Sequence, residues 1–284
     1  MKTRGDKPFE PTLPALTAIQ PLAASKPVPW VENGEIVSMP PLVLHPSAPR
    51  EDAATGSYLQ VIGIRGDAGA NKREKEIKLA LDGVDEMSRL AGVLGECVKE
   101  LQQFNLFYED PGEAWRRAKF SVRFRLENGA LELTIKGKGT RKDGVSDVIE
   151  ESMPVDASLW PALSKGHAGV PQLVRQLLED RKLSLPEGLS PDDLVVLGGF
   201  TNTRRVHRLP GDALHQVELD CSVFPNGVVS YEAEMELKTE SRARAERAFS
   251  RLEAAFAQAH VDWRPSNLPK MARLRAALKG TDPE

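Results

Sequence analysis

The sequence predicts an α+β fold built on an antiparallel sheet of eight strands with helices around it. Three observations support this fold class. From about Asn71 onward, short segments alternate apolar and polar residues, as strands with one buried face do. Asn128-Gly129 and Asn226-Gly227 separate neighbouring segments and favour tight hairpin turns. Other segments instead repeat their apolar residues at helical spacing.

Period-two alternation defines the strands, and a period near 3.6 defines the helices. The predicted strands span residues 74–80, 103–108, 119–125, 130–136, 147–152, 194–204, 215–221 and 228–237. The predicted helices span residues 84–100, 170–183, 241–259 and 268–279. Pro171 fits the first turn of the second helix, where its missing N–H costs nothing.

Residues 1–70 differ from the rest of the chain. Ten of the 21 prolines lie between Pro8 and Pro49, and the apolar residues there follow neither period. Proline removes a hydrogen-bond donor and fixes φ, so we expect a disordered or loosely packed N-terminal extension. Residues 58–64 form a short apolar segment that could add a strand. A single domain is then expected over residues 71–284.

Composition excludes several classes of protein. Hydrophobic residues make up 40% of the chain and charged residues 28%, as in soluble globular proteins. The net charge of -3 argues against a general nucleic-acid-binding surface. Cys97 and Cys221 are too far apart in sequence to suggest a disulfide framework, and no apolar stretch is long enough to span a membrane. We expect a cytoplasmic monomer or homodimer that contacts neither nucleic acid nor membrane.

The charged residues of the predicted strands share one face and form blocks of one sign. Arg123 and Arg125 lie on one side of their strand, and Glu232, Glu234 and Glu236 lie on one side of theirs. An ordinary sheet with one solvated face is the simple explanation. Like charges two residues apart repel, however, and a ligand that neutralises both kinds of block explains them better. A sheet closed into a barrel would place such a ligand inside.

A triphosphate with bound divalent metal is such a ligand. Mg²⁺ and Mn²⁺ prefer carboxylate and phosphate oxygens, while Arg and Lys neutralise phosphates. Phosphoryl transfer also depends mainly on positioning and charge neutralisation. The charge pattern therefore favours chemistry on a triphosphate.

The order of the motifs resembles that of the CYTH superfamily, the triphosphate tunnel metalloenzymes, over residues 71–259. Glu74-Lys-Glu-Ile-Lys78 is similar to the Glu-x-Glu-x-Lys signature of that family. The later segments that resemble family motifs are 103–111, 122–125, 133–137, 198–204, 217–220 and 231–236.

This resemblance implies an eight-stranded antiparallel tunnel, flanked by helices, that holds a triphosphate substrate with Mg²⁺ or Mn²⁺ as cofactor. The implied metal ligands are Glu74, Glu76, Glu232 and Glu234. The implied substrate-binding residues are Lys78, Arg123, Arg125, Lys136, Lys138 and Arg204. The implied catalytic residues are Glu74, Glu76, Glu234 and Lys78, and Glu150 and Asp220 are expected on the tunnel wall.

The chain departs from the family pattern in places. Glu109-Asp110 stands where the family often has Asp-Thr, and Ser146 stands where an Arg is common. Arg205 adjoins Arg204, so a shift of one residue in strand register would exchange the two.

The leading hypothesis is hydrolysis of a triphosphate with divalent metal. One metal would bind the triphosphate oxygens, and a second, on the side of Glu232 and Glu234, would position or activate water. Inorganic triphosphate is the first candidate substrate, followed by thiamine triphosphate or a nucleoside triphosphate. One alternative is an adenylate cyclase that makes cyclic AMP from ATP. Another is a non-catalytic polyphosphate- or nucleotide-binding module with the proline-rich segment as its interaction arm.

Overall fold

The computed structural model describes residues 29–32, 35–38, 73–142, 145–166, 169–239 and 241–281 of the 284-residue chain. No helix within these ranges is both long enough and apolar enough to cross a membrane.

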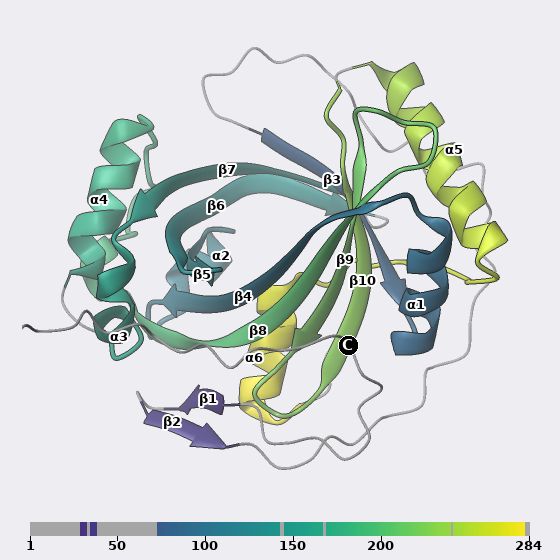
Figure 1. Ribbon diagram of the computed structural model, residues 1–284. Helices are drawn as coiled ribbons and strands as arrows, with labels where there is room; N and C mark the ends of the chain where they lie inside the picture. Colours follow the sequence, from purple (N-terminus) through teal and green to yellow (C-terminus); the bar gives the residue numbers. More distant parts are fainter. Residues whose placement is uncertain are drawn as a thin grey trace, which may run out of the picture.

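Eight antiparallel strands close into a barrel (Figure 1). Their order around it is β10-β9-β8-β4-β5-β6-β7-β3, and the pairing of β3 with β10 closes the ring. The strands are β3 (Arg73–Leu81), β4 (Cys97–Glu109), β5 (Ser121–Glu127), β6 (Ala130–Lys142), β7 (Val145–Val155), β8 (Val195–Arg208), β9 (Gln216–Val223) and β10 (Val229–Glu236). The predicted fold class and the eight-stranded tunnel are confirmed.

The apolar faces of the strands point outward and are covered by helices, which leaves the charged faces inside. Ile77 and Met235, on β3 and β10, belong to a core cluster shared with α1 and α5. Phe124 and Leu133, on β5 and β6, belong to a second cluster shared with α4. The helices are α1 (Val84–Val93), α2 (Ala114–Arg117), η2 (Ala157–Leu159), α3 (Trp160–Leu163), α4 (Val170–Asp180), η3 (Pro191–Asp193), α5 (Arg242–Gln258) and α6 (Lys270–Lys279).

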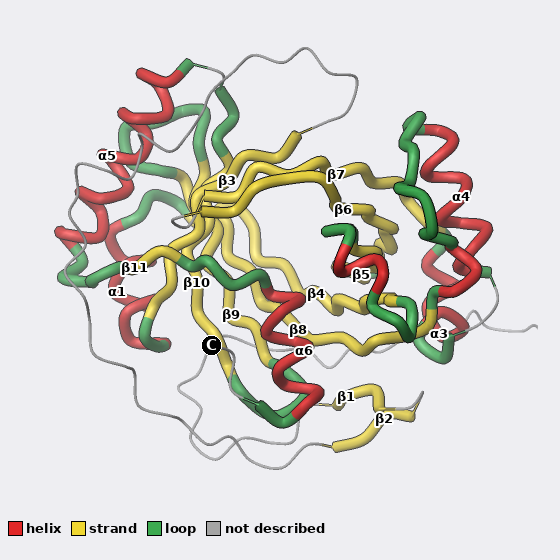
Figure 2. The backbone as a smooth tube through the Cα atoms, turned by 180° about the vertical axis from the view of Figure 1, so that it is seen from behind, coloured by secondary structure: helices red, strands yellow, loops and turns green. Residues whose placement is uncertain are grey.

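The last helix, α6, packs on the inner wall of the barrel instead of its outside. Met271 and Leu274 of α6 contact a cluster that includes Phe107 and Phe200, and those two rings share the inward face of β4 and β8. Figure 2 shows α6 in front of β8, at the open end of the barrel. The helix therefore covers one mouth of the tunnel.

One predicted helix is shorter than expected. Instead of running from 84 to 100, α1 ends at Val93, and Leu94 adopts an extended backbone. Gly95 N–H donates to the carbonyl oxygen of Arg208 at 2.9 Å, and Arg208 N–H donates to that of Glu96 at 3.0 Å. Pairing with β8 thus satisfies backbone groups that a longer helix would have used, so the tertiary contacts override the helical pattern.

Two small elements accompany the barrel. β11 (Arg264–Pro265) pairs with β3 outside the ring, beyond the point where the pairing of β3 with β7 ends. β1 (Pro29–Glu32) and β2 (Glu35–Ser38) form a separate antiparallel pair. The predicted strand at 58–64 lies outside the described residues, and the division of the chain at about residue 70 stays a prediction.

Candidate active site

A cavity inside the barrel collects most of the residues that the sequence predicted for a site. Those that line it are Glu76, Lys78, Arg123, Arg125, Lys136, Glu150, Arg204 and Glu234. Asp220 and Glu232 lie beside it and are buried. For Glu74 and Lys138 the backbone belongs to β3 and β6, but their side chains lie outside the described residues.

Strand alternation places these side chains inside. On β10, Ala233 and Met235 pack into the outer core, so Glu232 and Glu234 between them point inward. The register of β8 resolves the choice between its two adjacent arginines. Arg204 lines the cavity, whereas its neighbour Arg205 pairs outside with Glu100 at 3.1 Å.

Cations outnumber carboxylates on the side of the cavity formed by β5, β6 and β7. Lys136 Nζ lies 2.6 Å from Glu150, and Arg123 donates to the same carboxylate at 3.4 Å and to Thr134 Oγ1 at 3.0 Å. Arg125 adds a third positive charge to this side, for which Glu150 is the one carboxylate among the described residues that line it. This half of the cavity is therefore suited to an anion.

Arg125 is the least neutralised of these cations. Its Nε donates to Asn105 Oδ1 at 2.9 Å, and it forms no ion pair with any carboxylate in the described part of the chain. Removal from solvent, together with the nearby charges of Arg123 and Arg204, lowers the pKa of Arg125 to about 9, although Asp220 and Glu127 act in the opposite direction. A desolvated cation that no carboxylate contacts directly is costly, and a bound anion would reduce that cost.

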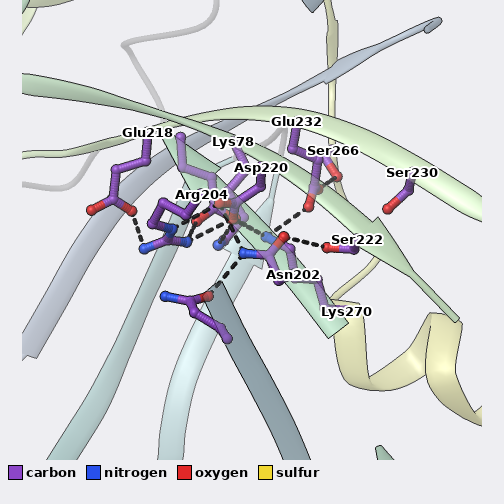
Figure 3. A network of polar contacts seen from close by, with 12 residues as sticks. Lys78, Asn202, Arg204, Glu218, Asp220, Ser222, Ser230, Glu232, Ser266 and Lys270 are labelled. Atoms are coloured by element: carbon purple, nitrogen blue, oxygen red, sulfur yellow. Dashed lines mark hydrogen bonds and ion pairs between the residues drawn. The ribbon is translucent and has the colours of Figure 1, made fainter. Parts of the chain in front are cut away.

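The opposite wall, formed by β9 and β10, carries buried carboxylates (Figure 3). Arg204 forms a two-pronged ion pair with Asp220, with distances of 2.7 and 2.6 Å, and its Nη2 lies 2.8 Å from Glu234. Arg204 also contacts Glu218. Lys78 Nζ lies 2.5 Å from Glu234 and 3.0 Å from Glu76.

Lys270, the first residue of α6, inserts its ammonium group among three of these carboxylates. Its Nζ lies 2.7 Å from Asp220, 2.9 Å from Glu232 and 2.6 Å from Glu234. Arg273, one turn further along, contacts Glu232 and donates to Ser230 Oγ at 2.8 Å. The final helix therefore supplies cations to the acidic wall.

Most of these carboxyl groups are held as carboxylates by their partners. Burial by itself would raise the pKa of Asp220, Glu232 and Glu234, but the surrounding cations, Lys270 and Arg204 foremost, outweigh it and the pKa values are lowered. For Glu218 the balance is reversed. Burial raises its pKa to about 7, in spite of Arg204.

A row of uncharged side chains fixes Asp220 from behind. Asn202 Nδ2 donates to Asp220 Oδ1 at 3.0 Å and to Gln103 Oε1 at 2.9 Å. Ser222 Oγ donates to Asn202 Oδ1 at 2.9 Å. Every link is buried, so the row holds Asp220 in one orientation.

Sequence reasoning missed Lys270, Arg273 and Asn202 as parts of the site. One stripe of the predicted helix at 268–279 carries Lys270, Arg273 and Leu274. Basic residues within an otherwise apolar stripe indicate a buried partner of opposite charge, so this pattern could have identified them. Asn202 lies in the segment 198–204 and on the same strand face as Arg204, so strand alternation could have found it.

The donor set has the chemistry of a divalent-metal site. Glu76, Glu232 and Glu234 offer carboxylate oxygens, the ligands that Mg²⁺ and Mn²⁺ prefer. Within the described residues, no group of three or more carboxylate, histidine or cysteine side chains has the arrangement that could hold a metal ion. The ammonium group of Lys270 lies between Asp220, Glu232 and Glu234.

The fold is a closed antiparallel barrel, and its inner face has a cationic wall and a carboxylate wall. This arrangement defines a tunnel protein with a charged interior. A family model for the CYTH domain matches residues 72–262, and the chain belongs to the CYTH family. The resemblance read from the sequence motifs is confirmed.

Comparison with solved structures finds one match with a TM-score above 0.5 among those described next, and it shows the same fold. A protein from Hippeastrum, described as a candidate adenylyl cyclase with a dominant triphosphatase activity, shares 27% identity and a TM-score of 0.60, over 73% of this chain and 96% of that one. The RNA triphosphatase domain of a mimivirus mRNA capping enzyme is 11% identical with a TM-score of 0.42, over 74% and 100% of the two chains. Comparison with curated proteins finds no match.

Proposed function

We propose that the chain is a divalent-metal-dependent triphosphatase and that inorganic triphosphate is its first substrate. The observation that carries this proposal is the surplus of cations around Arg123, Arg125 and Lys136. A triphosphate supplies the negative charge that this wall lacks. Family membership and the triphosphatase activity described for the Hippeastrum protein support the same reaction class.

In this proposal the two walls have different roles. Arg123 and Arg125 bind phosphate oxygens through their guanidinium forks, and Lys136 acts as a point charge beside them. Lys78 and Arg204 belong to β3 and β8, which lie between the two walls in the order of the strands, and each contacts Glu234. They would hold the end of the substrate that reaches the metal.

The carboxylate wall would hold the metal. Glu76, Glu232 and Glu234 are the proposed ligands, with Glu74 as a further predicted one and with Asp220 and Glu150 orienting cations beside them. Lys138 on β6 stays a predicted phosphate ligand. A bound Mg²⁺ or Mn²⁺ would neutralise phosphate charge and lower the pKa of a bound water at the terminal phosphate.

An apolar part of the cavity favours a second group of substrates. Phe107, Phe200 and Met271 line the same space as the cations. Flat organic groups pack well against aromatic rings and methionine. Thiamine triphosphate and nucleoside triphosphates are therefore the next candidates, and with ATP the alternative product is cyclic AMP.

Product analysis tests these assignments. The protein is incubated with inorganic triphosphate, thiamine triphosphate or ATP, in Mg²⁺, Mn²⁺ or EDTA, and both phosphate and cyclic AMP are measured. We expect metal-dependent phosphate release, fastest from inorganic triphosphate, and none with Glu234→Gln as the inactive control. Cyclic AMP formation from ATP would replace the hydrolase with the cyclase. Tight triphosphate binding without turnover in either metal would make the protein a binding module.

A further inference from the structure

We propose that Lys270 is a built-in counter-ion that competes with the divalent metal for the carboxylate wall, and that metal binding releases it toward the triphosphate. This inference rests on the proposed function for the identity of the metal. The observation behind it is the contact of one ammonium group with three separate carboxylates, at 2.6 to 2.9 Å.

Metal and ammonium compete for the oxygens of these carboxylates. A divalent cation binds carboxylate oxygens at about 2.0 to 2.6 Å. Lys270 Nζ contacts Oε2 of Glu232 and Oε1 of Glu234, two of the oxygens that the wall offers to a metal. A metal ion and an ammonium group that share these oxygens also repel each other strongly in a buried site. Binding of the metal should therefore displace the ammonium group.

Lys270 differs from the other cations of the wall in the element that carries it. Lys78 and Arg204 belong to barrel strands with neighbours on both sides. Lys270 is the first residue of α6 and follows Pro269, so its backbone takes no part in a strand pairing. The four-carbon side chain can move without breaking the barrel.

The released ammonium group has a place to go. Ser266, Pro269, Lys270 and Met271 all line the cavity that also contains Arg125. α6 itself stays attached to the barrel while the side chain of Lys270 moves. Arg273 holds Glu232 and Ser230, and Arg275 contacts Glu109 on β4. A change of side-chain rotamer would thus turn Lys270 from the carboxylates to a bound phosphate.

This exchange couples the two ligands. Without metal, Lys270 is engaged by carboxylates and contributes little to anion binding. With metal bound, it joins the cations that face the triphosphate, so metal and triphosphate strengthen the binding of each other through this residue.

Metal binding without substrate tests the competition. Free Mn²⁺ is followed by its electron paramagnetic resonance signal during titration of the wild type, Lys270→Met and Lys279→Met. Lys279 lies on the same helix, is exposed and is 3.8 Å from Glu113, which makes it the matched control. We expect Lys270→Met to bind Mn²⁺ at least about tenfold more tightly, within the usual range of coupling between sites, and Lys279→Met to match the wild type. Equal or weaker binding by a folded Lys270→Met would overturn the proposal.

A second measurement covers the case in which loss of Lys270 unfolds the site. The wild type is labelled with ¹⁵N at its lysine side chains, and the Lys270 resonance is assigned by its absence in Lys270→Arg, which keeps the charge. Mg²⁺ should shift that resonance and leave the one from Lys279 unchanged. An unchanged Lys270 signal at saturating Mg²⁺ would reject the exchange. Because neither readout needs turnover, failure of the triphosphatase assignment is distinguishable from failure of this one.

Discussion

Arg125 is the residue at which the charge of the cavity is most out of balance. It is desolvated, its neighbours Arg123 and Arg204 are also cations, and Asn105 is its hydrogen-bonding partner. A cation in this position should lower the stability of the free protein and should increase its affinity for an anionic ligand. Stability and ligand binding can therefore be separated at one side chain.

Arg125→Met should weaken triphosphate binding while stabilising the free protein or leaving its stability unchanged. A hydrogen bond to a charged group contributes about 1.5 to 3 kcal/mol, which corresponds to a loss of roughly 10- to 150-fold in affinity. Calorimetric titration and thermal unfolding measure the two effects. Arg205→Met, on the outer face of β8, should leave affinity intact. A variant that loses stability as well as affinity would show that Arg125 is structural.

Glu218 predicts a dependence of stability on pH. Burial raises its pKa to about 7, above the value near 4.5 of an unfolded chain. The folded state therefore holds this proton more tightly, and its stabilising contribution, complete below pH 4.5, is lost as the pH rises through 7. Asp220 and Glu234 have lowered pKa values and act in the opposite sense. Their contribution to stability is lost as the pH falls, and only below about pH 4.

Glu218→Gln removes the titrating group and should flatten this dependence. We expect the melting temperature of the variant, relative to the wild type, to be higher at pH 8 than at pH 5. Thermal unfolding at the two pH values, in buffers of equal ionic strength, measures the difference. A constant difference would mean that Glu218 titrates in the folded protein as it does in the unfolded chain.

For single residues, the sequence predicted well which face of a strand carries each side chain, but it predicted poorly which side chains contact one another. Alternation along β10 and β5 placed Glu234 and Arg125 on inward faces without any knowledge of the fold. The pairing of Lys270 with Glu234 was not predictable in the same way, since it joins residues 36 positions apart and depends on where a helix docks. Chain periodicity carries no information on that docking.

Among the elements, α6 is the one whose attachment matters most for the site. It packs on the inner wall through Leu274, which is fully buried, and through Met271. The sequence predicted this helix at 268–279, close to the observed bounds, but did not predict where it docks. Its contact with Phe107 and Phe200 inside the tunnel required the three-dimensional arrangement.

Leu274→Ala should loosen α6 without opening the barrel. Loss of a buried leucine side chain costs about 2 to 5 kcal/mol, and here the cost falls on the contact between one helix and the wall. Hydrogen exchange should become faster in residues 270–279 and stay unchanged in β4 and β8. Leu278→Ala, on an exposed part of the same helix, is the control. Faster exchange throughout the barrel would show that α6 and the strands unfold as one unit.

Two of the elements that departed from expectation did so for tertiary reasons. The pattern of apolar residues beyond Val93 suits a helix, but Gly95 and Glu96 exchange hydrogen bonds with Arg208. β4 is also longer than the predicted strand at 103–108, because β8 pairs along nearly all of it. Local sequence shows neither partner.

For the whole molecule, the balance of charge predicts how the protein responds to ligand. Binding to the folded state alone stabilises it by about 2.7 kcal/mol when the ligand is at a hundred times its Kd. For a domain of this size that corresponds to a rise of roughly 5 to 11 °C in melting temperature. Triphosphate with Mg²⁺ should produce this shift, and orthophosphate at equal concentration should produce much less. Differential scanning fluorimetry distinguishes the two, and equal shifts would argue against recognition of a triphosphate.

The overall architecture followed from the sequence because its signals are distributed over the chain. Eight alternating segments and like-charge blocks indicated a barrel with a charged interior, and the motif order indicated the family. The ring closure between β3 and β10 had no local signal, since these strands are the first and the last of the barrel.

That closure has a consequence for how the protein is made. Glu76 and Lys78 on β3 meet Glu236 and Glu234 on β10 in direct register, and the bond between Lys78 and Glu234 spans 156 positions. Contacts between such distant positions form slowly, after the intervening chain has been ordered. The seam of the ring and the carboxylates of the candidate site are thus assembled together, after β10 has been synthesised. A chain interrupted before β10 would contain most of the strands but no completed carboxylate wall.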